Sequence, residues 1–219
     1  MNNKDTAHPD APWLNSIRTS VETYLQNPHW INSPTSSITG GGAIEAAEDR
    51  FCQVLGIKHA IMFPSATYAM RAALAAHGVG PHDQVITPAF DWSANQAAVC
   101  SLGATPIHVP VSSDTLTLDP TATSAAVTGK TRAIIVTHTN GVPAAVPQLQ
   151  ALGLPVIEDF TGALGATFNH QHVGTMGTAG IMSTGPGKQL DTGEGAFLVT
   201  NDTNLYELGC LDVFGLWTL

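Results

Sequence analysis

Lys188 is the residue whose surroundings most clearly suggest chemistry. It lies in the glycine-rich stretch Ser183–Gly195, just before an apolar run that predicts a strand. Burial and cationic neighbours free the lone pair of a lysine amine, which can then form a Schiff base with a carbonyl group. The spacing also fits a surface lysine in a loop. Lys4, Lys58 and Lys130 lie in a polar N-terminal stretch or in turns, where a solvated charge is ordinary.

Small hydroxyl residues and an aromatic residue follow the first two predicted strands. Ser65-Ala66-Thr67 begins a predicted helix, and a helix N-terminus exposes backbone N–H groups that bind phosphate. The same residues also fit an ordinary helix N-cap. Trp92 follows the next strand, where its ring can stack on a flat ligand or fill the core.

An acid and a serine end two later strands. Asp159 ends an apolar strand, and a buried acid requires a partner, which can be a protonated pyridine nitrogen, a helix cap or a salt bridge. Ser183 ends the strand that precedes Lys188. Ligands of parallel sheets bind at the carboxyl ends of the strands, so these groups together predict a pyridoxal phosphate site.

The elements that must position these residues alternate along the chain. Apolar runs predict seven strands: His59–Phe63, Gln84–Pro88, Thr105–Val111, Arg132–His138, Pro155–Asp159, Gly180–Ser183 and Ala196–Thr200. Helical patterns cover Trp13–Leu25, Ala43–Leu55, Ala66–His77, Ser93–Leu102, Pro120–Thr128 and Val146–Leu152. This alternation predicts a three-layer α/β fold with a mostly parallel seven-stranded sheet.

Composition excludes several classes of function. The net charge of −9, with only 8 Lys and Arg residues, disfavours nucleic acid and anionic lipid as partners. No apolar run approaches membrane-spanning length.

Three widely spaced cysteines predict reduced thiols and a cytoplasmic protein. His170 and His172 have no further ligands nearby, so we expect a turn there and no metal site.

A dense series of motifs runs in order from about Gly40 to Asp202. It comprises Glu48-x-x-Phe51, Leu55-Gly56-Ile57-Lys58-His59-Ala60, Ser65-Ala66-Thr67, Val85-Ile86-Thr87-Pro88, Thr131-Arg132-Ala133-Ile134-Ile135, Ile157-Glu158-Asp159, Leu164-Gly165-Ala166-Thr167, Val173-Gly174-Thr175, and Lys188 with Thr192-Gly193-Glu194-Gly195. This series resembles the DegT/DnrJ-type (sugar) aminotransferases, which are fold-type I pyridoxal phosphate enzymes.

The resemblance implies a role for each candidate residue. Lys188 is similar to the lysine that holds the cofactor covalently and moves protons at the substrate carbon. Asp159 is similar to the acid that pairs with the pyridine nitrogen, and Trp92 to the aromatic residue stacked on the ring. Contacts with the cofactor phosphate are implied for Ser65, Ala66, Thr67 and Ser183.

The sequence also departs from the family pattern. Ala66 replaces the usual glycine, which would narrow the phosphate loop, and Gly162 stands where the family usually has a glutamine near the cofactor's phenolic oxygen. Family members also continue into a small C-terminal domain that is absent from this chain. We therefore expect an N-terminal helix and loop arm (1–40), a PLP-binding large domain (41–202) and an apolar tail at an interface (203–219).

The resemblance implies transfer of an amino group, from a donor such as glutamate to a cyclic ketone. The ketone would be a nucleotide-linked keto sugar or a cyclitol of a biosynthetic pathway. Two alternatives remain: a subunit of a split enzyme completed by a separate chain, and a non-catalytic relative. Lys188 and Asp159 argue against the second, because a binding scaffold needs no reactive amine. We expect a homo-oligomer, or a hetero-oligomer with a chain that supplies the missing part.

Overall fold

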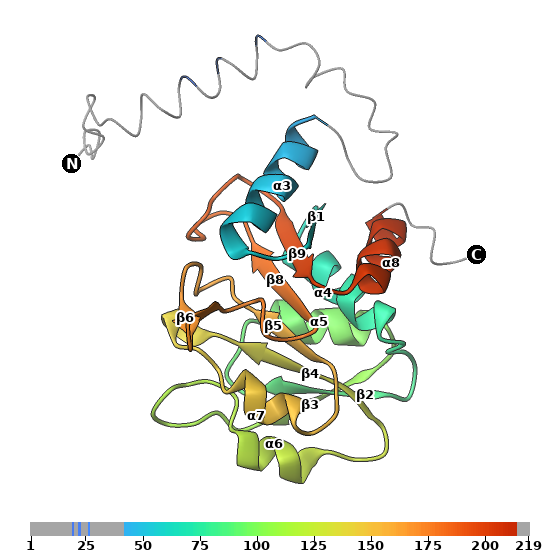
Figure 1. Ribbon diagram of the computed structural model, residues 1–219. Helices are drawn as coiled ribbons and strands as arrows, with labels where there is room; N and C mark the ends of the chain where they lie inside the picture. The colour runs from blue at the N-terminus through green and yellow to red at the C-terminus, as the bar shows by residue number, and fades with distance from the viewer. Residues whose placement is uncertain (1–18, 20–21, 23–25, 27–41, 214–219) are drawn as a thin grey trace, which may run out of the picture. The chain divides into compact units, whose positions relative to one another are not determined.

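The computed structural model of the 219-residue chain describes residues 19, 22, 26 and 42–213, with side chains to residue 210 (Figure 1). The chain divides into two units, residues 1–46 and 47–219. In the first unit, residues 43–46 form the start of helix α3 (Ala43–Leu55). The predicted helix Trp13–Leu25 lies outside the described residues, apart from residues 19 and 22, which are helical. The sheet and the pocket both belong to the second unit.

Seven strands form one sheet, in the order β1-β9-β8-β5-β4-β2-β3. The four pairs among β8, β5, β4, β2 and β3 are parallel, whereas β9 runs antiparallel to both β8 and β1. The strands are β1 (His59–Phe63), β2 (Gln84–Pro88), β3 (Thr105–Val109), β4 (Thr131–Thr137), β5 (Val156–Asp159), β8 (Ala179–Ser183) and β9 (Ala196–Thr200). The predicted mostly parallel seven-stranded sheet is therefore confirmed.

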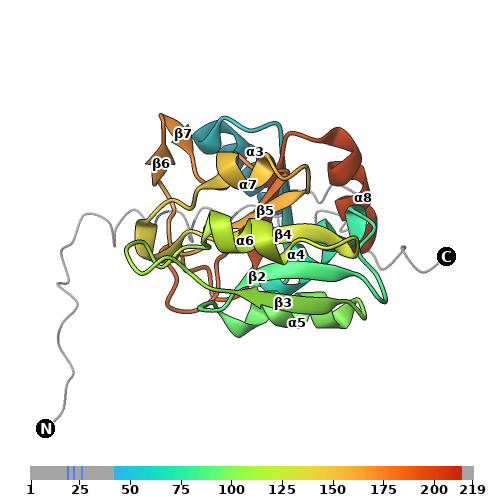
Figure 2. The ribbon, with the colours of Figure 1, turned by 90° about the horizontal axis from the view of Figure 1, so that it is seen from below.

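Helices cover both faces of this sheet and complete the three layers (Figures 1 and 2). One face packs against α4 (Ala66–Ala76), α5 (Ser93–Ser101) and α8 (Thr203–Val213). The other face packs against α3, α6 (Pro120–Ala126) and α7 (Val146–Gln150). Because successive residues of a strand point to opposite faces, the apolar runs of the central strands supply both cores.

Local chemistry sets several helix ends. The Ser65 and Asp119 side chains cap α4 and α6, and Pro120 occupies the first turn of α6, where its missing N–H costs nothing. Gly56, with φ of 65°, follows α3, because a glycine adopts the left-handed conformation without strain. These ends place the start of α4 directly after β1, at the edge of the sheet where the pocket lies.

Two features lie outside the predicted set of elements. Residues 203–213, expected to belong to an apolar tail, form α8, which contacts α4 and β1. Strands β6 (Thr167–Phe168) and β7 (Gln171–His172) form a small hairpin. Its turn residues Asn169 and His170 have φ of 49° and 66°, so His170 lies at the expected turn, whereas His172 is the last residue of β7. Across the described residues, no helix combines the length and apolarity needed to span a membrane.

A buried carboxylate ties β5 to the neighbouring loop. Glu158 has no exposed surface, and its Oε1 accepts from the backbone N–H groups of Met176 and Gly177, at 2.7 and 2.5 Å. Its Oε2 accepts from Gly174 N at 2.9 Å and lies 2.8 Å from His138 Nε2. His138 Nδ1 accepts from Ala144 N, so Nε2 carries the proton that it donates to Glu158. This carboxylate therefore satisfies four donors inside the core.

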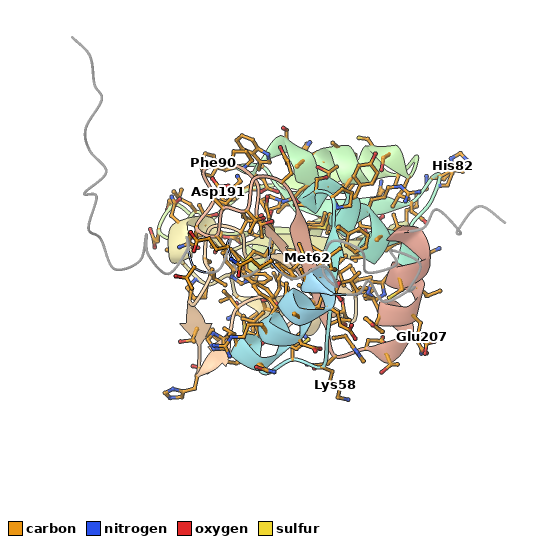
Figure 3. All side chains as sticks on the ribbon, turned by 90° about the horizontal axis from the view of Figure 1, so that it is seen from above. Lys58, Met62, His82, Phe90, Asp191 and Glu207 are labelled. Atoms are coloured by element: carbon orange, nitrogen blue, oxygen red, sulfur yellow. The ribbon has the colours of Figure 1, made fainter. Side chains whose placement is uncertain are left out.

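We expect Glu158→Gln to destabilise the fold by roughly 3 kcal/mol, because an amide NH₂ would face two N–H donors whichever way it turned. Urea unfolding followed by circular dichroism measures the change in the free energy of unfolding. Glu207→Gln on the exposed surface of α8 is the matched control and should change stability little (Figure 3). Equal stability of the two variants would show that the four hydrogen bonds contribute nothing.

Candidate active site

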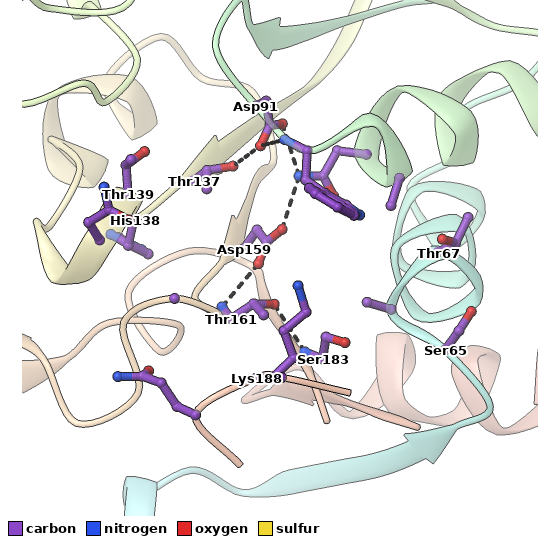
Figure 4. Close-up of a pocket in the computed structure, with 18 of the residues that line it drawn as sticks. Ser65, Thr67, Asp91, Thr137, His138, Thr139, Asp159, Thr161, Ser183 and Lys188 are labelled. Atoms are coloured by element: carbon purple, nitrogen blue, oxygen red, sulfur yellow. Dashed lines mark hydrogen bonds between the residues drawn. The ribbon is translucent and has the colours of Figure 1, made fainter. Parts of the chain in front are cut away.

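A cavity of about 540 Å³ opens at the carboxyl ends of the strands (Figure 4). All the residues singled out from the sequence line it: Ser65, Ala66, Thr67, Trp92, Asp159, Ser183 and Lys188. They come from segments far apart in the chain, after β1 and β2, at the ends of β5 and β8, and in the loop between β8 and β9. The topology of the sheet, which brings these ends to one edge, is what gathers them.

The loop after β8 holds Lys188 in the pocket wall. Lys188 is half-buried, and its Nζ lies 4.9 Å from the centroid of the Trp92 ring. The neighbouring Gln189 accepts a hydrogen bond from Leu164 N at 2.8 Å, which ties the loop to the segment after β5. The amine therefore stands over an aromatic face inside the cavity, in a cation–π arrangement.

Asp191 braces the same loop from outside. One of its carboxylate oxygens accepts from Gly187 N at 2.8 Å, and the other accepts from Gly193 N at 2.9 Å. Gly187 and Gly193 both have positive φ, 75° and 89°, which an L side chain rarely adopts. The N–H of Gly187, followed by that of Gly193, holds the pKa of Asp191 below its ordinary value. An ionised Asp191 thus closes the turn that carries Lys188.

Asp159 is buried at the end of β5, with 8% of its surface exposed. Its Oδ1 accepts from Thr161 N at 3.0 Å, and its Oδ2 accepts from Asn95 Nδ2 at 3.0 Å. A carboxylate can accept about four hydrogen bonds, so capacity remains for a donor within the pocket. Of the partners that the sequence allowed, the described contacts show neither a helix cap nor a salt bridge at Asp159.

The opposite wall is formed by the N-terminus of α4. Ser65 Oγ accepts from Tyr68 N at 3.5 Å, so Ser65 is the N-cap of the helix and at the same time lines the cavity. Figure 4 shows Ser65 and Thr67 across the cavity from Thr137 and His138. The Ser183 hydroxyl lies near the lysine loop and accepts from Gly185 N at 3.3 Å. The first-turn N–H groups of α4 lack partners within the helix and can bind an anion.

The pocket also contains polar residues that were not expected from the sequence, namely Asp91, Asn95, Thr137 and Thr161. Burial raises the pKa of the Asp91 carboxyl, and the charge of Asp159 adds to this effect, whereas hydrogen bonds from Asn95 and Thr137 oppose it. Asp91 lies before α5 (Ser93–Ser101), so no helical spacing links it to Asn95, and the sequence carried no local signal for this pair.

The structure also clarifies two further positions in the cavity wall, His138 and Gly162. His138 has no exposed surface and is fully hydrogen-bonded by Glu158 and Ala144, so it is a core histidine whose atoms border the cavity. A Cβ at Gly162 would meet nothing closer than Asn140 N, at 3.8 Å. Space therefore does not forbid a side chain there, and the glycine leaves that part of the wall open.

Comparison with known proteins agrees with this arrangement. Residues 22–217 match the DegT/DnrJ/EryC1/StrS aminotransferase family, and the chain belongs to that family. The crystal structure of 3-amino-5-hydroxybenzoic acid synthase is 31% identical, with a TM-score of 0.82, over 90% of this chain and 51% of that one. S. venezuelae DesV, in complex with a ketimine intermediate, is 31% identical, with a TM-score of 0.80, over 91% and 54%.

A third related structure is a GDP-4-keto-6-deoxymannose-3-dehydratase with a trapped PLP-glutamate geminal diamine. It is 28% identical, with a TM-score of 0.71, over 76% of this chain and 46% of that one. The chain thus spans about half the length of the structures that it matches. The cofactor of this family is pyridoxal 5′-phosphate, as expected from the sequence.

We expect Asp191→Ala to loosen the lysine loop and to lower the hydrogen-exchange protection of the Gly187 amide. A carboxylate whose pKa is lowered in the folded state contributes stability above its unfolded pKa, and that contribution is lost as the pH falls through the folded pKa. The difference in Gly187 protection between Asp191→Ala and the wild type should therefore be full at neutral pH and vanish in acid. Asp114→Ala, in an exposed loop, is the control. Equal protection of the Gly187 amide in Asp191→Ala and the wild type at pH 7 would show that Asp191 does not stabilise the loop.

Proposed function

We propose that this chain forms the cofactor site of a pyridoxal phosphate-dependent aminotransferase that aminates a cyclic ketone. The observation that carries the proposal is the convergence of Lys188, Asp159 and the N-terminus of α4 on one cavity. An amine, a buried carboxylate and a cluster of N–H and hydroxyl donors match the aldehyde, the pyridine nitrogen and the phosphate of the cofactor. The residues present therefore fit the group.

Each residue has a distinct task in this proposal. Lys188 Nζ would hold the cofactor through its aldehyde carbon, with loss of water, and, once the amino donor has replaced it there, would take the proton from the donor's α-carbon. Asp159 would accept a hydrogen bond from the pyridine N–H and keep that nitrogen protonated. Ser65, Thr67 and Ser183 would donate hydrogen bonds to the phosphate oxygens. When bound, the cofactor supplies an electron-withdrawing ring that stabilises negative charge on the substrate carbon.

Trp92 would cover one face of the ring. Its side chain is 69% exposed although it lines the cavity, so a planar ligand would bury apolar surface that the chain alone leaves in water. The Lys188 amine now faces this indole. Stacking on Trp92 would hold the ring parallel to the indole and fix which face of the ring the lysine reaches.

The names of the related structures support a cyclic substrate. One relative is a synthase of an aminated carbocycle, and another is named for a nucleotide-linked keto sugar. The family resemblance also implies a dehydratase branch that carries a histidine in place of the lysine, and Lys188 argues against that branch. A keto sugar or a cyclitol as the acceptor, with glutamate as the donor, fits both observations.

We further propose a cytoplasmic location and an oligomeric assembly for this chain. Cys52, Cys100 and Cys210 are all free, which fits a reducing cytoplasm. We expect a homo-oligomer. Size-exclusion chromatography with light scattering measures the oligomeric state of the purified chain, and a monomer at micromolar concentration would contradict this expectation.

We expect the purified chain to bind pyridoxal phosphate and to turn yellow. Borohydride reduction should remove the colour and leave the reduced cofactor, as a covalent label, on the peptide that contains Lys188. Lys188→Ala should bind the cofactor without the covalent label and lose about 10²–10⁴-fold of the rate of 2-oxoglutarate formation from glutamate. Absorption spectroscopy, peptide mapping by mass spectrometry and a single-turnover assay provide the readouts.

Lys58→Ala is the matched control for this experiment. Lys58 is exposed and points into solvent at the edge opposite Phe90 and Asp191 (Figure 3), so its removal should leave colour and label unchanged. A label on a lysine other than Lys188, or an intact rate in Lys188→Ala, would refute the assignment.

A further inference from the structure

Asp91 is a second carboxylate in the cavity, and the roles proposed above do not use it. Its Oδ1 accepts from Trp92 N and from the Thr137 hydroxyl, both at 2.8 Å. Its Oδ2 accepts from Asn95 Nδ2 at 2.9 Å. The side chain therefore joins the loop after β2, the first turn of α5 and the end of β4.

Asn95 connects this carboxylate to Asp159. Its side chain is 4% exposed, and its amide nitrogen donates to Asp91 Oδ2 and also to Asp159 Oδ2, at 2.9 and 3.0 Å (Figure 4). An amide nitrogen has two hydrogens, so one hydrogen serves each carboxylate. The opposite amide orientation would place an oxygen against two carboxylate oxygens, so the two acids determine how Asn95 is oriented.

We propose that Asp91 is a positioning residue that acts through the Asn95 amide to hold Asp159 in the orientation that receives the pyridine nitrogen. This inference rests on the proposed function, because it concerns how Asp159 meets the cofactor. Without Asp91 as an acceptor, the Asn95 amide loses the partner that keeps its nitrogen turned toward Asp159. Of the two described hydrogen bonds to the Asp159 carboxylate, the one from Thr161 N would then remain and the one from Asn95 would be weakened.

The electrostatics of the pair agree with this role. Two carboxylates in a partly desolvated site repel each other, and burial together with the charge of Asp159 raises the pKa of Asp91. The amide hydrogens between the two oxygens offset that repulsion. The cavity also holds Lys188, which favours negative charge nearby, whereas His138 is already bonded to Glu158.

The isosteric change Asp91→Asn tests the relay, because it keeps the shape of the side chain. Oδ1 already receives two donors, so the new NH₂ group must take the place of Oδ2 and face the Asn95 amide. Asn95 must then either lose this contact or turn its oxygen toward Asp159. Asn95→Leu removes the link directly, and Asp114→Asn in an exposed loop is the isosteric control.

We expect Asp91→Asn and Asn95→Leu each to weaken pyridoxal phosphate binding by about tenfold or more and to shift the visible absorption maximum of the bound cofactor. The double variant should bind no more weakly than the weaker single variant, because both changes break one connection. The dissociation constants come from titrating the unloaded full chain with the cofactor, and thermal unfolding without cofactor checks that each variant is folded. If Asn95→Leu does not fold, Asp91→Asn alone decides.

Unchanged affinity and spectrum in Asp91→Asn, or effects that multiply in the double variant, would overturn the relay. Failure of the wild-type chain to bind pyridoxal phosphate would refute the proposed function, and a cofactor-free measurement would then decide the relay. In that measurement, the side-chain amide resonance of Asn95 in the unloaded chain should shift, and its hydrogens should exchange faster with water, in Asp91→Asn. An unchanged resonance would overturn the proposal independently of the cofactor.

Discussion

Two consecutive carboxylates end the buried strand β5, and the cost of burying them constrains much of the surrounding structure. Because neighbouring residues of a strand point to opposite faces, Glu158 and Asp159 need separate sets of donors. Glu158 obtains its donors from the backbone of the loop at residues 174–177 and from His138. Asp159 obtains its donors from Thr161 and Asn95, in the wall of the cavity.

The donors of Glu158 require a close backbone approach, which only small residues allow. A Cβ at Gly177 would collide with the Val156 carbonyl, and a Cβ at Gly174 would collide with the Phe160 ring. These glycines let the loop pass close under β5, so that its N–H groups reach the carboxylate. The same contacts hold His138 at the end of β4, next to the cavity. The hydrogen bonds that hold the end of β5 therefore all come from the chain itself and require no ligand.

Apolar periodicity predicted the elements well because the central strands are buried on both faces. The bounds predicted for β1, β2, β9 and α3 match those of the structure. The predicted site residues do line one cavity, because each ends or follows a strand and the carboxyl ends of parallel strands lie at one edge. Asp91 and Asn95 were not predicted: their contacts depend on how the first turn of α5 lies against β4 and β5, which no local pattern records. Residues 203–213 were assigned to a tail because their apolar composition does not distinguish an interface from a helix packed on α4.

The charges of the cavity determine how the proposed cofactor would be held. Among the described residues that line the cavity, one is a lysine, Lys188, and none is an arginine. Two of them, Asp91 and Asp159, have carboxylate side chains. Lys188 is assigned to the aldehyde, so the phosphate would be bound by the N–H groups of α4 and by hydroxyl groups. Such neutral donors orient an anion by direction more than by charge. Two acids at one end and a helix N-terminus at the other then give the cavity a polarity that matches a pyridinium and a phosphate, and this polarity would set the orientation of the proposed cofactor.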